Sequence, residues 1–176
     1  MQLQDYIRVY DNIFSKEFCE ELIWQFGVAQ GVHKHYKPNL SFDQLNMNLT
    51  HACRPYMDRI FDSCESIKKR YLKDCAIEFV PTHAYEMCKM KKYTKNIDYF
   101  ETHIDSADAQ TGHRFLVMLF YLNTVDAGET EFTTLGLKIP AVQGSALIFP
   151  SNFLYPHRGT IPLQDKYIFS TYLLCD

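Results

Sequence analysis

The sequence predicts one α+β domain in which two helices precede about eight short strands. Two observations support this prediction. Apolar residues recur at three- and four-residue steps before Asp74, as expected for helices. After Asp74, short runs with β character alternate with Gly, Pro, Asn and Asp, a spacing typical of a sandwich or barrel. The length of 176 residues fits one domain, so we expect residues 1–75 to be mainly helical support and residues 76–176 to form the β core with the functional site.

The N-terminal part begins with an alternating segment, residues 7–10, which predicts a short strand ended by Asp11 and Asn12. Ser15 has the residue type of a helix N-cap, and Gly27 or Gly31 would close that first helix. A polar, basic connection over residues 31–40 follows. The second helix is expected from about residue 41 to 73, broken or kinked at Pro55.

The expected strands are short segments bounded by turn residues. They lie within residues 76–93, 99–104, 114–122, 129–133, 137–139, 145–149, 157–161 and 166–174. No internal repeat, low-complexity tract or linker divides the chain, so we predict a single domain over residues 1–176.

Composition excludes some partners and leaves others open. The chain is 47% hydrophobic, with 13 Phe and 12 Tyr, which is enough apolar material for a compact core. Its net charge of −3 gives no electrostatic reason to expect a nucleic-acid partner. No apolar stretch approaches the roughly 20 residues that span a bilayer, so no membrane partner is expected. The sequence does not indicate an oligomeric state.

The six cysteines lack zinc-finger spacing, because no two of them form a C-x-x-C pair. Nothing in residues 1–5 resembles a signal peptide. We therefore expect reduced, mostly buried thiols in a cytoplasmic protein. These cysteines are Cys19, Cys53, Cys64, Cys75, Cys88 and Cys175.

A candidate metal site begins with His103 and Asp105, which form an H-x-D pattern in a predicted strand. Side chains two residues apart on a strand face the same side, so both can reach one metal ion. His157, on another predicted strand, can supply a third ligand. Two histidines and one carboxylate on one face of an octahedron leave three positions open, as in non-haem Fe(II) oxygenases.

A candidate anion site follows nine residues after His157. Lys166, Ser170 and Tyr172 share one face of the last predicted strand. A lysine with a hydroxyl beside it can anchor a carboxylate through charge-assisted hydrogen bonds.

Further motifs occur around these residues in a fixed order. They are Tyr93, Phe100, His103-x-Asp105, Arg114 with Tyr121-Leu122-Asn123, Ala127-Gly128-Glu129-Thr130-Glu131-Phe132, Pro140-x3-Gly144-Ser145-Ala146-Leu147-Ile148-Phe149, His157 and Lys166. In this order and spacing, the sequence resembles the 2-oxoglutarate- and Fe(II)-dependent oxygenases of the prolyl 4-hydroxylase type. The resemblance covers residues 83–174 and, more loosely, the whole chain.

The resemblance implies a double-stranded β-helix (a cupin-like jelly roll) with the N-terminal helices packed on one sheet. It implies O2-dependent hydroxylation of an unactivated C–H bond, most readily of a prolyl or other peptidyl residue, with release of succinate and CO2. Fe(II), 2-oxoglutarate as cosubstrate and ascorbate as a candidate reductant are the implied cofactors.

Residue roles carry over in the same way. His103, Asp105 and His157 would bind iron and form the catalytic centre. Lys166 would pair with the distal carboxylate of 2-oxoglutarate. The other implied cosubstrate residues are Tyr121, Ser170 and Tyr93, the implied substrate-pocket residues are Tyr172 and Phe100, and the implied structural residues are Arg114, Glu129, Thr130 and Phe132.

The sequence departs from the family pattern at several positions. The glycine expected between Tyr93 and the H-x-D motif is absent, and Asn96 could supply a left-handed turn instead. Ala127 replaces the first glycine of its motif, Val117 stands where Thr is common, and Asp165 stands where Gly is frequent. The first departure lies near the expected substrate entrance, so the motifs specify the cofactors better than the substrate.

Other interpretations remain beside this one. A hydroxylase of a small molecule or free amino acid would use the same site. A nucleic-acid demethylase is disfavoured because Arg158 has no second arginine six residues later. A non-catalytic β-sandwich module would be expected to lack a ligand, and all three are present. We interpret the basic run over residues 89–92 as a solvated face rather than a device for steering an acidic substrate. His33, His35, His51, His83 and His113 match no ligand position.

Overall fold

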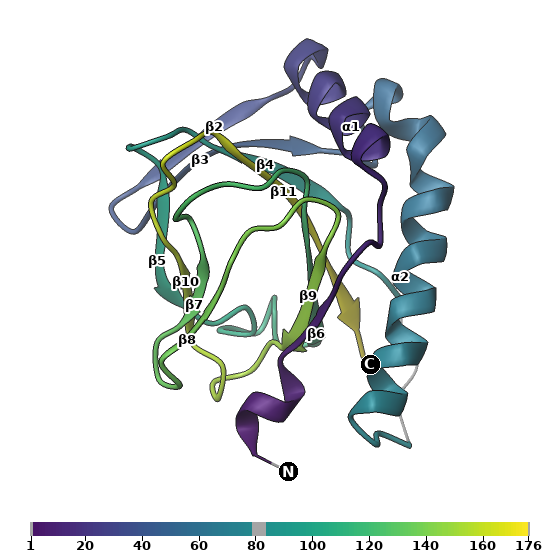
Figure 1. Ribbon diagram of the computed structural model, residues 1–176, viewed down its shortest axis with the longest axis vertical. Helices are drawn as coiled ribbons and strands as arrows, with labels where there is room; N and C mark the ends of the chain where they lie inside the picture. The colour runs from purple at the N-terminus through teal and green to yellow at the C-terminus, as the bar shows by residue number, and fades with distance from the viewer. Residues whose placement is uncertain (1, 79–83, 176) are drawn as a thin grey trace.

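The computed structural model describes residues 2–78 and 84–175. The described strands form one curled antiparallel sheet in the order β1-β9-β6-β11-β4-β3-β5-β10-β7-β8, and β2 pairs with β3. Figure 1 shows these strands arranged around an inner core, with α1 and α2 outside the curl on one side. This arrangement is the double-stranded β-helix expected from the sequence.

The elements follow one another in a simple order along the chain. Their bounds are η1 Leu3–Tyr6, β1 Arg8–Tyr10, α1 Lys16–Val28, β2 His33–Lys37, β3 Leu40–Asn46, η2 His51–Cys53, α2 Arg54–Asp74, β4 Lys89–Tyr93, β5 Tyr99–His103, β6 Arg114–Tyr121, β7 Thr130–Phe132, β8 Leu137–Ile139, β9 Ala146–Pro150, β10 His157–Gly159 and β11 Lys166–Leu174.

Two apolar clusters lie on opposite faces of the sheet because strand side chains alternate. Along β6, Met118 and Phe120 belong to the cluster that packs against the helices, which contribute Leu22 from α1 and Ile60 from α2. Tyr121 on the same strand belongs to the cluster inside the curl. The helices therefore support the sheet from outside, and the inner face is left for the site.

The first helix begins as the sequence predicts. The Ser15 side chain accepts a hydrogen bond from the Phe18 backbone N–H, which caps α1. The helix ends at Val28, and Gly31 follows with a positive φ of 94°. Gly27 lies within the helix and does not close it.

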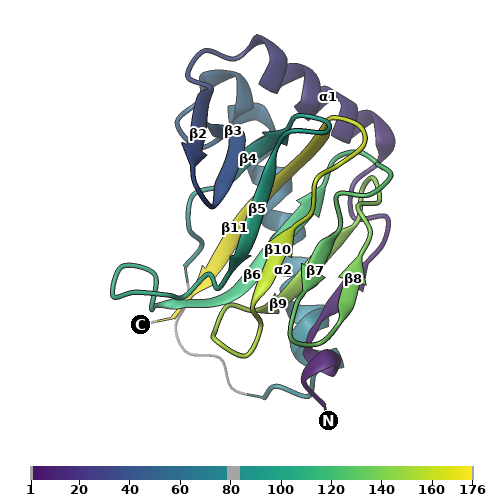
Figure 2. The ribbon, with the colours of Figure 1, turned by 90° about the vertical axis from the view of Figure 1, so that its left-hand side faces the viewer.

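The second helix is shorter than the sequence suggested, and the expected helix over residues 41–53 is wrong. Residues 40–46 form β3, which pairs with β2, β4 and β5. Figure 2 shows β2 and β3 side by side as a hairpin next to β4. Part of the expected connection over residues 31–40 is therefore the strand β2. The helix α2 starts at Arg54 with Pro55 in its first turn, where a missing backbone N–H costs no helical hydrogen bond.

The later strands match the sequence closely. Each of the expected segments from residue 99 onwards contains a strand. Within 76–93 only Lys89–Tyr93 is a strand, and residues 79–83 of that segment lie outside the described ones. Asn96 has the positive φ proposed for it, 59°, and Ala127 has a φ of 58°.

The described cysteines are all free, and five of the six are buried. Burial raises the pKa of Cys88 to about 12 and that of Cys19 to about 11, which leaves both as unreactive thiols. None of the helices in the described part of the chain has the length and apolar character to cross a membrane.

Candidate active site

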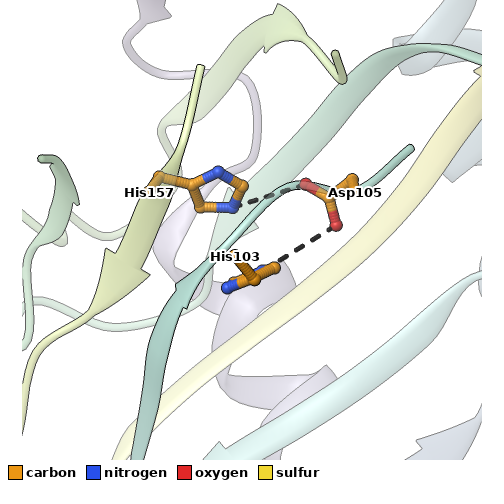
Figure 3. Close-up of side chains that lie close together, drawn as sticks. All are labelled: His103, Asp105 and His157. Carbon is orange, nitrogen blue, oxygen red and sulfur yellow. Dashed lines mark ion pairs between the residues drawn. The ribbon is translucent and has the colours of Figure 1, made fainter. Parts of the chain in front are cut away.

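Two neighbouring strands bring the three predicted ligands together. His103 ends β5, Asp105 follows two residues later, and His157 begins β10. Strands β5 and β10 are antiparallel, and His157 lies directly opposite His103. One ligand atom from each of the three side chains lies within 4.8 Å of the others. Figure 3 shows the side chains converging, with His157 Nε2 3.3 Å from Asp105 Oδ2 and His103 Nε2 4.0 Å from Asp105 Oδ1.

Backbone carbonyls fix the orientation of both imidazoles. His103 Nδ1 lies 2.8 Å from the Glu101 carbonyl oxygen, and His157 Nδ1 lies 3.1 Å from that of Tyr155. A proton on each Nδ1 donates these bonds and leaves each Nε2 lone pair directed at Asp105, the tautomer that a metal ligand needs. Phe100 stacks on His103 with 3.6 Å between ring centroids, which holds that ring in place.

Asp105 accepts two hydrogen bonds, one at its carboxylate and one at its backbone carbonyl, and its second carboxylate oxygen accepts none from the described residues. The Tyr172 hydroxyl donates to Asp105 Oδ1 at 2.7 Å, and Arg114 Nη1 donates to the Asp105 carbonyl oxygen at 2.9 Å. Arg114 is itself fixed by two hydrogen bonds to Glu86. Asp105 Oδ2 is buried without a hydrogen-bond partner among the described residues. A buried carboxylate oxygen without a donor implies a partner such as a metal ion.

The protonation states suit metal binding. Burial, and then the neighbouring His157, lower the pKa of His103 to about 4. Burial alone would raise the pKa of Asp105, but electrostatic interactions with His157 and His103 and the hydrogen bond from Tyr172 hold it below its usual range. Neutral imidazole and ionised carboxylate are the forms that bind a cation.

A buried cation lies on the same inner wall. Lys166, at the start of β11, is 2% exposed and donates a hydrogen bond from Nζ to the Gly128 carbonyl oxygen at 2.7 Å. Its ammonium group lies 4.6 Å from the Tyr93 ring centroid. Burial lowers the pKa of Lys166 to about 8, and no carboxylate in residues 2–78 and 84–175 forms an ion pair with it.

The metal-ligand triad and Lys166 line one cavity. Ser170 lies two strand positions beyond Ile168 on the same face, and its hydroxyl is buried without a hydrogen-bond partner among the described residues. Among the described residues, the cavity thus contains an ammonium without a counter-ion, and a hydroxyl and a carboxylate oxygen without hydrogen-bond partners. The other predicted residues that line it are Tyr93, Phe100 and Tyr172.

Tyr121 contacts a residue that lines the cavity, and its role in binding 2-oxoglutarate stays a prediction. It is fully buried in the inner core, and its hydroxyl lies 2.8 Å from Thr130 Oγ1, whereas Thr130 is the one that lines the cavity. Motif position suggested Tyr121 and did not reveal this hydrogen bond. Arg114 was expected to be structural, and its hydrogen bond to the Asp105 carbonyl oxygen shows which residue it holds.

Lys91 was missed by the sequence analysis, and the expectation of a solvated basic run is wrong. Lys89 pairs with Glu86 at 2.8 Å and Lys92 with Asp165 at 2.8 Å, whereas Lys91 lines the cavity. Strand alternation could have revealed it, because Lys91 lies two residues before Tyr93 and therefore on the same face.

A curled antiparallel sheet with two histidines and one carboxylate on facing positions, all turned toward one cavity, defines a non-haem metal oxygenase. Residues 88–174 match the family model of the 2OG-Fe(II) oxygenase superfamily. The matched segment contains the three candidate ligands and Lys166, and it indicates a 2-oxoglutarate-dependent dioxygenase, for which Fe(II) and 2-oxoglutarate are the cofactors. No curated protein matches the chain in sequence.

Solved structures share the whole fold. The viral collagen prolyl hydroxylase of Paramecium Bursaria Chlorella virus-1, in its complex with 2OG, has a TM-score of 0.72 at 18% identity, covering 97% of each chain. A Trichoplax adhaerens prolyl hydroxylase in complex with a hypoxia inducible factor peptide fragment has a TM-score of 0.67 at 15% identity, covering 97% of this chain and 84% of that one. A Pseudomonas putida prolyl-4-hydroxylase has a TM-score of 0.67 at 12% identity, covering 97% and 93%.

Proposed function

We propose that this oxygenase hydroxylates a C–H bond of a prolyl or other peptidyl residue, with release of succinate and CO2. The observation that carries the proposal is the buried Lys166 ammonium, which faces the same cavity as the triad and has no counter-ion among the described residues. Burial of an ammonium group without a counter-ion is costly, so an anion that enters the cavity would be bound favourably.

The residues present fit both cofactors. His103, Asp105 and His157 would hold Fe(II), because two Nε2 lone pairs and the unpartnered Asp105 Oδ2 converge. Lys166 and the unpartnered Ser170 hydroxyl would bind the distal carboxylate of 2-oxoglutarate. When bound, iron and 2-oxoglutarate supply the oxidation by O2 that converts a C–H bond into an alcohol.

The protein's own contribution is positioning and exclusion of water. Val117, Leu119, Phe149 and Ile168 form apolar lining of the cavity, so few solvent molecules compete with the reactants. Tyr172 holds Oδ1 of Asp105, and Arg114 holds the backbone of the same residue. These contacts keep the carboxylate in one orientation as substrates enter and leave.

A peptidyl substrate is supported by the shape around the site. An open groove adjoins the cavity and shares Lys91, Phe100, His103, Asp105 and Tyr172 with it. The groove continues over β3 and the segment after Asp105, as an extended substrate requires. The structures with this fold are named as prolyl hydroxylases, one of them in complex with a peptide fragment.

The test is a screen for a mass gain of one oxygen. Capped peptides containing proline, the same peptides with alanine in its place, and free amino acids are incubated with the protein, Fe(II), 2-oxoglutarate and ascorbate. We include ascorbate as the proposed reductant and omit it in a parallel series. The proposal expects oxygen gain in the peptides. Gain that is lost when alanine replaces proline identifies a prolyl target, and gain that persists identifies another peptidyl residue. Oxygen gain confined to free amino acids would contradict a peptidyl substrate and indicate a small-molecule substrate.

A further inference from the structure

A second inward-facing lysine lies where the groove meets the cavity. Lys91, on β4, lines both, whereas Lys166 lines only the cavity. Its neighbours in both linings include His103, Asp105 and Tyr172. Lys91 is therefore placed at the entrance to the metal-ligand triad, where a substrate arriving along the groove would pass.

Lys91 has no counter-ion in the described part of the chain. The flanking Lys89 and Lys92 are each paired with a carboxylate at 2.8 Å, and no ion pair includes Lys91. Its ammonium group lies instead 5.1 Å from the Phe42 ring centroid and 5.9 Å from that of Phe100. Aromatic faces attract a cation weakly and hold it in position, but they do not neutralise its charge.

The charges of the cofactors leave Lys91 unbalanced. Burial lowers the pKa of Lys91 to about 8, and the charge of Asp105 is the strongest influence that opposes this shift. Fe(II) bound to Asp105 would carry one net positive charge, and the dianion 2-oxoglutarate would balance that charge together with Lys166. The loaded site then retains one positive charge, that of Lys91, and a desolvated charge without a partner is costly.

We propose that Lys91 binds a carboxylate of the primary substrate, close to the carbon that is hydroxylated. The inference rests on the proposed function and adds a substrate class to it. In a peptide, the carboxylate would come from an acidic residue next to the target residue. In a free amino acid, it would be the α-carboxylate.

Matched pairs of probes measure this preference by calorimetric titration into the protein loaded with Mn(II) and N-oxalylglycine, an unreactive analogue of 2-oxoglutarate. Capped Ala-Pro-Glu and Glu-Pro-Ala are each compared with their Gln counterparts, and L-proline is compared with L-prolinamide. We expect the acidic member of at least one pair to bind about 10- to 100-fold more tightly, the usual value of a hydrogen bond to a charged group. The pair that responds identifies the source of the carboxylate.

Three variants assign the preference to Lys91. Lys91→Met should make the acidic and neutral probes bind equally, whereas Lys91→Arg should keep the preference for the acidic probe. Lys92→Met is the matched control, because Lys92 lies on the same strand but pairs with Asp165 outside the cavity. It should bind both probes like the wild type.

Two results would overturn the inference. One is that the wild type binds both members of every probe pair equally, or binds neither. The other is a Lys91→Met protein whose 2-oxoglutarate requirement rises more than its probe dissociation constant, which would assign Lys91 to the cosubstrate. Succinate release measured without probe separates failure of the proposed function from failure of this inference. Wild-type protein that releases succinate but binds acidic and neutral probes equally contradicts only the role of Lys91.

Discussion

The Tyr172 hydroxyl donates a hydrogen bond to Asp105 Oδ1 at 2.7 Å, and this bond leaves Oδ2 as the carboxylate oxygen nearest His157 Nε2. The Arg114 guanidinium covers the Tyr172 ring at 3.9 Å and also bonds the Asp105 backbone. Tyr172 thus holds the carboxylate of Asp105 and Arg114 holds its backbone, so Tyr172 is a positioning residue for a metal ligand.

The change Tyr172→Phe removes this bond and keeps the ring under Arg114. We expect the dissociation constant for Fe(II) to rise about 10-fold, the usual effect of losing a group that orients a ligand. Anaerobic Fe(II) titration measures it, with unfolding in urea as the control for stability. An unchanged constant would mean that Arg114 alone positions Asp105.

The change Lys166→Met removes the buried charge and keeps a similar side-chain length. We expect the 2-oxoglutarate requirement to rise about 10- to 100-fold, because a charge-assisted hydrogen bond contributes about 1.5–3 kcal/mol. The Fe(II) requirement should change far less. Both are measured through succinate release, and equal effects on the two requirements would contradict the anchoring role. Ser170→Ala should give the same pattern with a smaller change.

The pH dependence of 2-oxoglutarate binding should follow Lys166. Burial lowers the pKa of Lys166 to about 8, and only its protonated form attracts a carboxylate. Affinity should therefore be full at about one unit below pH 8, fall as the pH rises through 8, and decline by about tenfold per unit above it. Direct binding titrations between pH 6.5 and 9.5 test this, with Lys166→Arg as the comparison, because arginine stays charged throughout. If the decline in 2-oxoglutarate affinity at high pH is the same in Lys166→Arg as in the wild type, another group causes it.

The stability of the fold depends on Gly144. This residue has a φ of 79°, and its carbonyl accepts hydrogen bonds from the backbone N–H groups of Ile13 and Phe14. A Cβ at this position would collide with the Phe14 carbonyl oxygen. Gly144→Ala should lower the free energy of unfolding by about 3 kcal/mol in urea titrations.

The matched control is Gly27→Ala, because Gly27 lies within α1 with open space around its Cα. This change should raise the free energy of unfolding by about 0.5–1 kcal/mol, since alanine favours a helix over glycine. If both changes alter the free energy of unfolding similarly, the fold does not require glycine at position 144.

The sequence predicted the later strands well because their inner and outer faces differ in chemistry. His103 and Asp105 had to share a face, as did Lys166 and Ser170, and the structure directs all four into one cavity. Residues 40–46 were assigned to a helix because Leu45, Leu49 and Cys53 recur at four-residue steps, which also fits a short strand, a turn and a helix start. Pairing with β2 and β4 makes residues 40–46 a strand rather than a helix, and strand pairing is not visible in local spacing.

The chemistry of the site was predicted less completely than its ligands. Lys91 was hidden by its neighbours, because four residues with three lysines resemble a solvated face although one of them points inward. Tyr121 was assigned to the cosubstrate from motif position, which stays a prediction, and motif position did not reveal that its hydroxyl also forms a hydrogen bond with Thr130 Oγ1. Both features depend on the neighbours that a side chain acquires in the folded chain, which local spacing does not show.

The central claim is that His103, Asp105 and His157 bind the iron that drives 2-oxoglutarate turnover. The most direct measurement is succinate formed from 2-oxoglutarate, with and without Fe(II), in the wild type and in His103→Ala. We predict succinate release from the wild type that depends on Fe(II), and loss of at least 100-fold in His103→Ala, about the 2.7 kcal/mol expected from removing a metal ligand. Wild-type protein that binds no Fe(II) and releases no succinate, or a variant that releases it at the wild-type rate, would contradict the claim.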